Sequence, residues 1–314
     1  MADMSLPSDG MSIDQLAGSR KRLMREQVIR HGLFGAALFS VVISLLIMYA
    51  LFSEAWVFMR DVDWGVVWGE IGWFPRRGIY DMPTLLVASL WTTAIAMIVA
   101  APIGLGAAIY LAEYARPRTR KILKPILEVL AGIPSVVLGF FALSWIAPNV
   151  VSNIGGEGGR GSIMAAGIGV GILTIPLVAS ISEDAMKSVP NALREASAGM
   201  GAKKVTTVLR VVLPASVSGL VAAMIVAVSR ALGETMVVFM AGGAADAAIK
   251  TYSPYEGSLT MTAAMASLAS GTDSVVGEGL TFQSLFFVGL VLFLITLVLN
   301  VVGNRFVARV REQY

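Results

Sequence analysis

Six long apolar runs separated by polar segments dominate the sequence. A helix needs about 20 apolar residues to span the hydrocarbon core of a bilayer, and each run reaches that length. The pattern therefore predicts six transmembrane helices, over 32–58, 83–111, 122–147, 162–182, 215–243 and 282–302. The third and fifth runs hold proline or polar residues mid-span, which favours a position against protein rather than lipid.

Composition agrees with membrane insertion. Hydrophobic residues make up 56% and charged residues 14% of the 314 residues, which is too much apolar surface for one water-soluble core. The net charge of +3 is spread over short clusters beside the apolar runs, a pattern that argues against nucleic-acid binding. The sequence has no cysteine and one histidine, His31, and we expect no metal site, no cofactor and no catalytic constellation.

Lysine and arginine predict the orientation, because cytoplasmic loops near the ends of spans carry the excess of these residues. One set of loops holds Arg116, Arg118, Arg120, Lys121, Lys124, Lys187, Arg194, Lys203, Lys204, Arg210, Arg305, Arg309 and Arg311. The N-terminal segment belongs to the same set, because it carries a basic cluster of its own between Arg20 and Arg30. The opposite loops hold few cations among many carboxylates. Both termini are therefore expected in the cytoplasm, and the first run is expected to stay in the membrane as a signal anchor.

A polar segment that begins at Glu183, between the fourth and fifth runs, is the most informative part of the chain. Pro190 is well placed to start a short helix, because a proline in the first turn loses no hydrogen bond. Gly201 suits the left-handed residue that ends such a helix. A second short helix can follow over 205–211, and Pro214 then breaks the chain into the fifth run. The segment predicts a helix-turn-helix on the cytosolic surface, with an ordinary re-entry loop as the alternative.

The residue order in this segment resembles a known family. Glu195-Ala196-Ser197, then Gly201, then Leu213-Pro214 are similar to the EAA loop of permease subunits in bacterial ABC importers. The resemblance implies that the loop docks in a groove of an ATP-hydrolysing subunit and transmits its closure to the spans. The coupling residues would be Glu195, Ala196, Ser197, Gly201, Leu213 and Pro214. The small Ala196 and Ser197 permit close approach, and Glu195 can pair with a basic group on the partner.

An arginine and a glutamate lie inside the fifth run. Each would cost a few kcal/mol or more facing lipid, so Arg230 and Glu234 are expected to face protein or water. Four residues apart on a helix, they share one face and can pair. An arriving oxyanion can compete for the guanidinium, whose planar fork of donors suits phosphate. A fixed ion pair that locks this helix to a neighbour is the alternative.

The residues around Arg230 make the family resemblance more specific. Ser229-Arg230-Ala231-Leu232-Gly233-Glu234-Thr235-Met236 is similar to the fifth-span motif of phosphate ABC importer permeases of the PstC type. Gly132-Ile133-Pro134-Ser135 and Ile175-Pro176 also match, and the similarity runs from about Gly78 to the C-terminus. The resemblance implies an all-α membrane protein with the fold of a type I ABC importer permease, in which Arg230, Glu234 and Thr235 line the substrate path.

We therefore expect a cytoplasmic tail over 1–31, a transmembrane anchor over 32–58, a permease core over 83–302 and a cytoplasmic tail over 303–314. The resemblance implies one half of a phosphate channel in the bacterial inner membrane. Its partners would be ATP-hydrolysing subunits, a second permease of the PstA type, a periplasmic phosphate-binding protein and membrane lipid. Two alternatives stay open: a permease for molybdate or sulfate, and an ion-driven secondary transporter in which Arg230 and Glu234 form the coupling site.

Glycines inside the spans and two glutamates near the span ends complete the pattern. Glycines at 104, 106, 167, 169 and 171 are expected to let helices approach closely in lipid. Glu113 and Glu128 lie near the cytosolic ends of spans among arginines, where they are expected to form solvated ion pairs rather than a proton relay.

Overall fold

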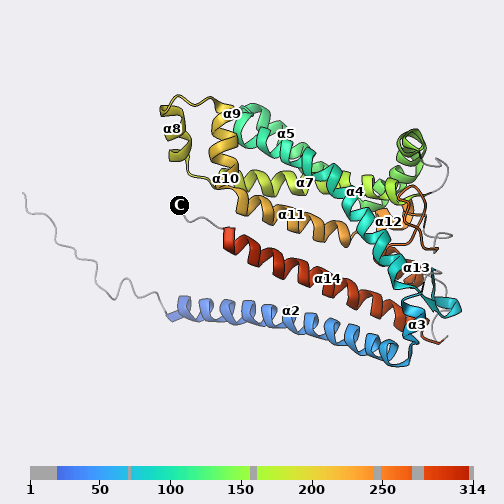
Figure 1. Cartoon of the computed structure of the whole chain (residues 1–314). Helices are drawn as coiled ribbons and strands as arrows, with labels where there is room; N and C mark the ends of the chain where they lie inside the picture. The colour runs from blue at the N-terminus through green and yellow to red at the C-terminus, as the bar shows by residue number, and fades with distance from the viewer. Residues whose placement is uncertain (1–19, 70–71, 156–160, 244–248, 271–278, 311–314) are drawn as a thin grey trace, which may run out of the picture. The chain divides into compact units, whose positions relative to one another are not determined.

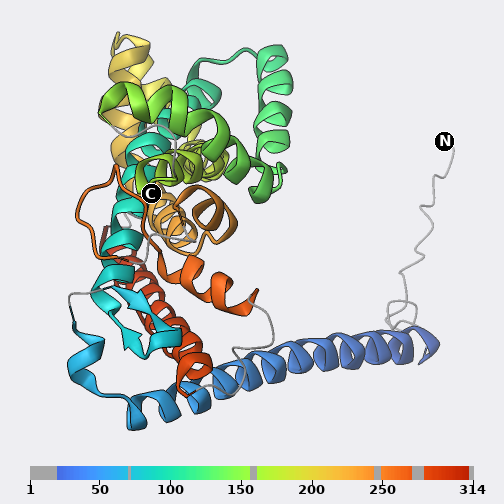
Figure 2. The same ribbon diagram turned by 90° about the vertical axis from the view of Figure 1, so that its right-hand side faces the viewer.

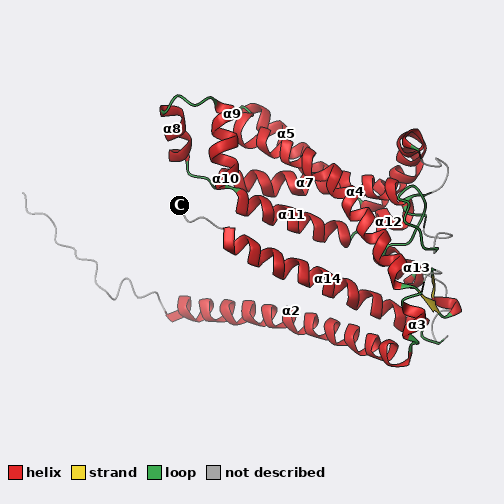
Figure 3. Ribbon diagram, viewed as in Figure 1, coloured by secondary structure: helices red, strands yellow, loops and turns green. Residues whose placement is uncertain are grey.

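The computed structural model describes residues 20–69, 72–155, 161–243, 249–270 and 279–310, and most of them are helical (Figures 1 and 3). Most of the expected N-terminal tail and the end of the C-terminal tail lie outside the described residues. The chain divides into two compact units, Met1–Leu51 and Phe52–Tyr314. In the first unit, every described side chain from Met24 to Ala50 is exposed. An apolar helix of this kind is suited to lipid contact.

The second unit holds the rest of the secondary structure. Its first part comprises the end of α2 (Arg20–Asp61), α3 (Trp64–Val67), β1 (Trp73–Phe74), η1 (Pro75–Arg77), β2 (Ile79–Tyr80), α4 (Met82–Ile109), η2 (Tyr110–Tyr114), α5 (Pro117–Ala131), α6 (Ser135–Phe141), η3 (Ala142–Val151) and η4 (Ser152–Ile154). Its second part comprises α7 (Ile163–Lys187), α8 (Asn191–Gly199), α9 (Lys204–Thr207), η5 (Val208–Val212), α10 (Leu213–Ala215), α11 (Val217–Leu232), α12 (Met236–Ala241), α13 (Met261–Ala269) and α14 (Thr281–Val310). The antiparallel pair β1–β2 is the only named sheet in the described ranges.

Short elements collect at the two ends of this unit. The helices α8, α9 and α10 lie at one end, together with the C-terminal end of α14 (Figure 1). The hairpin β1–β2 and the helix α13 lie at the opposite end, which faces the viewer in Figure 2. Aromatic packing fixes that end, where the Phe58 ring stacks on Phe287 at 4.8 Å and meets Tyr80 edge-on at 5.0 Å. The long helices between the ends place the polar segment of the sequence far from the hairpin.

Five helical stretches of the described chain are long and apolar enough to cross a membrane, and a bent pair makes a sixth. The five are Met24–Asp61, Met82–Tyr114, Ser135–Ile154, Ile163–Lys187 and Thr281–Arg309. The bent pair is Lys204–Ala215 with Val217–Leu232, which meet at 69°. The predicted all-α membrane fold is therefore confirmed, and it has the predicted six spans when the bent pair counts as one span.

The expected boundaries of the third span were wrong. The sequence predicted one helix over 122–147, whereas α5 ends at Ala131 and α6 begins at Ser135. Pro134 stands between them in an extended conformation with ψ 133°, and the residue before a proline is biased away from helix as well. The apolar stretch that can span the membrane is shifted to Ser135–Ile154. This leaves α5 as a separate helix that packs along α7.

Close packing of α4 on α7 depends on glycine. A Cβ added at Gly104 would lie 2.7 Å from the Val178 side chain, and one at Gly167 would lie 2.7 Å from Ile95. A Cβ at Gly171 would meet Val99 at 2.8 Å, and one at Gly169 would meet Val237 of α12 at 2.9 Å. These four glycines confirm the packing prediction. Gly106 does not, because a Cβ there would meet nothing within 4 Å.

Candidate functional site

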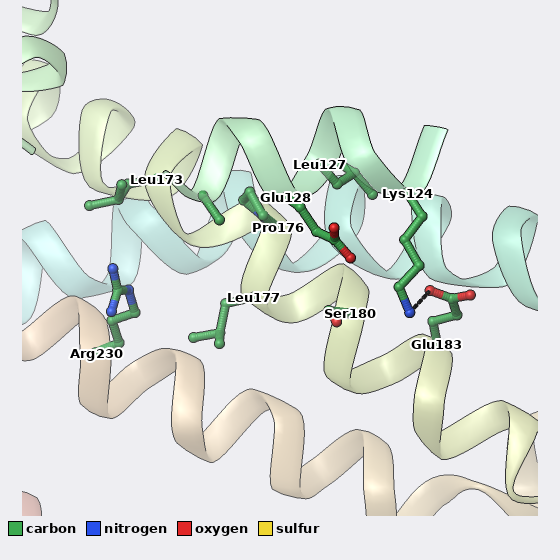
Figure 4. Close-up of a pocket in the computed structure, with 10 residues that line it drawn as sticks. Lys124, Leu127, Glu128, Leu173, Pro176, Leu177, Ser180, Glu183 and Arg230 are labelled. Atoms are coloured by element: carbon green, nitrogen blue, oxygen red, sulfur yellow. Dashed lines mark ion pairs between the residues drawn. The ribbon is translucent and has the colours of Figure 1, made fainter. Parts of the chain in front are cut away.

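A cavity of about 320 Å³ lies between α5, α7 and α11. Its wall on α7 is one helix face, running from Leu173 through Leu177 and Ser180 to Glu183, which is about 15 Å of helix. Arg230 of α11 lies at one end, and Lys124 of α5 meets Glu183 at the other (Figure 4). The cavity therefore extends from the middle of the bundle toward the end that holds the polar segment.

Arg230 places a positive charge partway along the helix bundle, on a side chain that is exposed. It is near the C-terminal end of α11, about 20 Å along the axis from Val217. Its guanidinium points into the cavity (Figure 4). Across the described ranges, no ion pair or hydrogen bond engages this side chain. A guanidinium in this state offers its full fork of donors to an anion.

The expected pairing of Arg230 with Glu234 was wrong. The helix α11 ends at Leu232, so the four-residue spacing no longer places the two side chains on one helical face. Glu234 instead turns toward the next helix, where its Oε1 accepts hydrogen bonds from the amides of Met236 at 3.2 Å and Val237 at 3.4 Å. These are unpaired donors at the start of α12, and a carboxylate is a favourable acceptor for them.

The predicted fifth span over 215–243 is thus broken at Gly233–Thr235. The Thr235 hydroxyl donates to the Gly233 carbonyl at 3.3 Å. From α13, the Thr262 hydroxyl donates to the Glu234 carbonyl at 2.7 Å. These bonds satisfy part of the backbone that the helix break exposes, as non-helical backbone inside a membrane requires. Thr235 lies in this break, next to Glu234 and beyond the end of α11.

A buried carboxylate at the other end of the cavity was not identified from the sequence. Glu183 is 1% exposed, and Arg120 Nη2 lies 2.8 Å from its Oε1, which also accepts from Lys187 Nζ. Lys124 Nζ lies 3.7 Å from the second oxygen, Oε2. The four-residue spacing of Glu183 and Lys187 was readable from the sequence, but their contacts with α5 depend on how the two helices pack.

The polar segment folds as two helices joined by a tight turn. Pro190 precedes α8, as predicted, and Gly201 adopts the left-handed conformation with φ +76°. Glu195 and Ala196 are exposed on α8, and Met200 beside them is 88% exposed. The Ser197 hydroxyl lies 2.8 Å from that of Thr207, which ties α8 to α9. The segment therefore presents an exposed helix face next to a tight turn.

Pro214 does not break the chain where the sequence predicted. The helical stretch Lys204–Ala215 runs through Leu213 and Pro214 and bends only at Ser216. A π turn over Val208–Val212 precedes the proline, in which the Leu213 amide bonds to the carbonyl of Val208, five residues back. Such a widened turn accommodates irregular backbone bonding within a helix. The bend of 69° then directs α11 into the bundle.

Arg194 anchors α8 to the long helices. Its guanidinium donates to Glu113 Oε1 through Nη2 at 2.8 Å and Nε at 3.2 Å, and to the carbonyl of Met186 at 2.8 Å. Met186 lies in the last turn of α7, and Glu113 lies in η2 directly after α4. The expected ion pair of Glu113 is present, but it is mostly buried and not solvated as predicted. Glu128 has no ion pair among the described residues.

The sequence of this chain matches a family of known transport proteins. Residues 100–312 match the family described as binding-protein-dependent transport system inner membrane component. The chain belongs to this family. The match includes the cavity, the break after α11 and the helices α8 to α10. The family resemblance that we stated from the residue motifs is confirmed.

Three relatives of this chain are named as phosphate transport system permease proteins. The chain is 35% identical over 256 residues to "Phosphate transport system permease protein PstC 1" of Mycobacterium tuberculosis, which covers 75% of each chain. It is 27% identical over 323 residues to PstC of Mesorhizobium japonicum, which covers 95% of this chain and 96% of that one. It is also 27% identical over 226 residues to the permease PstA 1 of M. tuberculosis, covering 71% of this chain and 70% of that one.

A solved structure supports the fold. The transport component aligns with a chain of the inward-facing MetNI methionine ABC transporter with a TM-score of 0.52, covering 73% of this chain and 94% of the other. The sequence identity is 19%. The alignment supports the predicted fold of an ABC importer permease. It does not identify the substrate, because a shared fold says nothing by itself about what is transported.

Proposed function

We propose that this chain is a channel-forming permease subunit of an ATP-driven phosphate importer. In this role it passes inorganic phosphate from a periplasmic binding protein to the cytoplasm. The observation that carries the proposal is Arg230, an unpaired guanidinium aimed into a cavity inside the bundle. The names of the relatives point the same way, since several are phosphate transport system permeases.

Charge explains why the cavity suits an oxyanion. Arg230 is exposed toward the cavity and has no carboxylate partner among the described residues, so its charge is open to an anion that enters. The planar fork of Arg230 matches two oxygens of phosphate in a bidentate arrangement. Glu234 and Thr235 lie just beyond α11, and we assign them to the substrate path through the break that they form.

The polar segment serves as the coupling element. We assign Glu195, Ala196 and Ser197 to the contact with an ATP-hydrolysing subunit, because α8 presents two of them at the surface. The turn at Gly201 and the helical stretch through Leu213 and Pro214 carry the movement toward α11. The chain is a transporter subunit, and ATP hydrolysis belongs to the separate partner subunits.

The arrangement of the two ends supports an orientation in the bacterial inner membrane. The helix α8 and the C-terminal end of α14 lie at the same end of the second unit (Figure 1). Cations lie in and after α8, at Arg194, Lys203, Lys204 and Arg210, and near the end of α14, at Arg305 and Arg309, which favours the cytoplasmic side for both. The hairpin end then faces the periplasm, where a phosphate-binding protein docks. A second permease of the PstA type completes the channel, and lipid surrounds both.

Transport by the whole complex tests the proposal. The complex would be reconstituted in vesicles with its ATPase, second permease and binding protein, and radiolabelled phosphate uptake measured with and without ATP. Arg230→Gln should lower uptake by at least about tenfold, since a charge-assisted bond contributes roughly 1.5–3 kcal/mol. Arg230→Lys keeps the charge without the fork and should recover part of the rate.

Controls separate this function from the alternatives. Arg305→Gln removes an exposed arginine that does not line the cavity with Arg230, and this variant should transport normally. Molybdate or sulfate that is taken up in preference to phosphate would assign the chain to another oxyanion. Uptake by this chain alone, without ATP, would replace the proposal with a secondary transporter.

A further inference from the structure

The ion pairs around Glu183 are unequal. Both close cations, Arg120 and Lys187, approach the same oxygen, Oε1. Lys124 stands 3.7 Å from Oε2 and 4.0 Å from Asp184 Oδ1, and both distances exceed hydrogen-bond length. If Lys124 turns away, Glu183 keeps two cationic partners. The cluster can therefore release Lys124 without leaving a buried carboxylate unpaired.

Lys124 also lies where two cavities adjoin. It lines the cavity that contains Arg230, and it lines a second cavity of about 530 Å³ with Arg120, Lys121 and Pro117. The Lys124 side chain is 36% exposed, so its ammonium group is reachable from either space. Figure 4 shows Lys124 at the opposite end of the first cavity from Arg230, with Ser180 between them on α7. Lys124 is the next cation along this wall from Arg230, and Glu128 of α5 lies between the two.

We propose that Lys124 is a second oxyanion-binding residue, which receives phosphate from Arg230 at the exit end of the cavity. This inference rests on the proposed function, because it assigns a further step to the same route. The ammonium group moves from Glu183 Oε2 to a phosphate oxygen, and no covalent bond changes. Glu183 keeps Arg120 and Lys187 when Lys124 moves, and the only other carboxylate ion-paired with Lys124 among the described residues, Asp184, is 65% exposed and lies 4.0 Å away.

Glu128 explains why such a site would release its anion. It lies four residues after Lys124 on α5, lines both cavities and has no ion pair in the described ranges. Its carboxylate repels phosphate and competes for the Lys124 ammonium. Conduction needs sites that bind well enough to be entered and weakly enough to be left. The pair Lys124–Glu128 meets both needs within one turn of helix.

Chemical labelling tests the site in the unaltered protein. The whole complex, in phosphatidylcholine vesicles, would be acylated with an amine-selective reagent, and the modified fraction at Lys124 measured by mass spectrometry. Phosphate should protect Lys124, and chloride at equal ionic strength should not. Equal labelling in both salts would overturn the inference. A lipid phosphate is the other source of the same chemistry, so protection by added phosphatidylglycerol without free phosphate would also overturn it.

Transport by variants gives a second measurement. Lys124→Gln should lower phosphate uptake per ATP hydrolysed by about tenfold, and Lys124→Arg should restore most of it. Arg118→Gln, on the same helix but outside both cavities, should leave uptake unchanged. If Lys124→Gln transports like the unaltered complex, the exit site is wrong while the proposed function stands. If the unaltered complex takes up no phosphate, the proposed function fails, and this inference fails with it.

Discussion

Arg194 Nη2 lies 2.8 Å from Glu113 Oε1 and joins the surface helix α8 to the end of α4. The pair is mostly buried, with side-chain exposures of 21% and 8%. The same guanidinium holds the carbonyls of Met186 and Val189 at the end of α7. Arg194 therefore joins three segments, α8, the end of α4 and the end of α7. We propose that it transmits a displacement of α8 to these two long helices, of which α7 forms part of the cavity wall.

Arg194→Ala should uncouple ATP hydrolysis from transport. The variant loses the ion pair with Glu113 and both carbonyl contacts, so movement of α8 no longer pulls on α4 and α7. We expect uptake to fall by about tenfold while ATP hydrolysis by the complex continues. The measurement is the ratio of phosphate transported to ATP hydrolysed in vesicles. Arg210→Ala, which removes an exposed arginine of the same segment, is the control. Equal ratios in the two variants would contradict the role of Arg194.

Gly201→Val should have a similar effect for a different reason. A Cβ at Gly201 meets nothing within 4 Å, so the cost comes from its left-handed φ of +76°. That conformation costs a residue with a side chain roughly 1–2 kcal/mol, and a β-branched residue suffers most. Gly201→Asn, which tolerates this region, should be milder. Transport per ATP should thus decrease in the order Gly, Asn, Val.

Gly199→Val is the matched control for that series. Gly199 also has open space around its Cβ position, but its φ is not in the left-handed region. A normal ratio in this variant would assign the defect at Gly201 to the backbone turn. An equal loss at both positions would point instead to the bulk of valine at the docking surface.

Gly104→Ala and Gly106→Ala should differ in stability although they lie two residues apart. A Cβ at Gly104 would approach Val178 to 2.7 Å, so α4 and α7 must separate. Overpacking of this kind costs about 1–3 kcal/mol. At Gly106 the Cβ meets no atom within 4 Å, and alanine should be neutral or slightly stabilising. Thermal unfolding in detergent would compare them, and equal Tm values would contradict the close packing.

Glu234→Ala and Glu234→Gln distinguish capping from charge. The Oε1 of Glu234 accepts from two amides at the start of α12, and glutamine retains an acceptor oxygen there. Loss of a cap costs about 0.5–2 kcal/mol, so the alanine variant should have the lower Tm. If both variants unfold at the same temperature, the side chain does not stabilise the break after α11.

Local features of the sequence determined much of this protein. The length and polarity of the apolar runs fixed the number of spans, because a bilayer imposes that length on any helix. Pro190 and Gly201 marked the start of α8 and the turn after it, since both act through their own backbone dihedrals. The motifs around Glu195 and Arg230 were enough to indicate the family.

Only the tertiary structure decided what the charged residues contact. The break at Gly233 separated Glu234 from Arg230, and the interruption at Pro134 freed α5 to lie along α7. That packing brings Arg120 and Lys124 to Glu183, some sixty residues away in sequence. Hydropathy and helical spacing describe one helix at a time, whereas an ion pair between helices depends on where each helix ends and which neighbour it packs against.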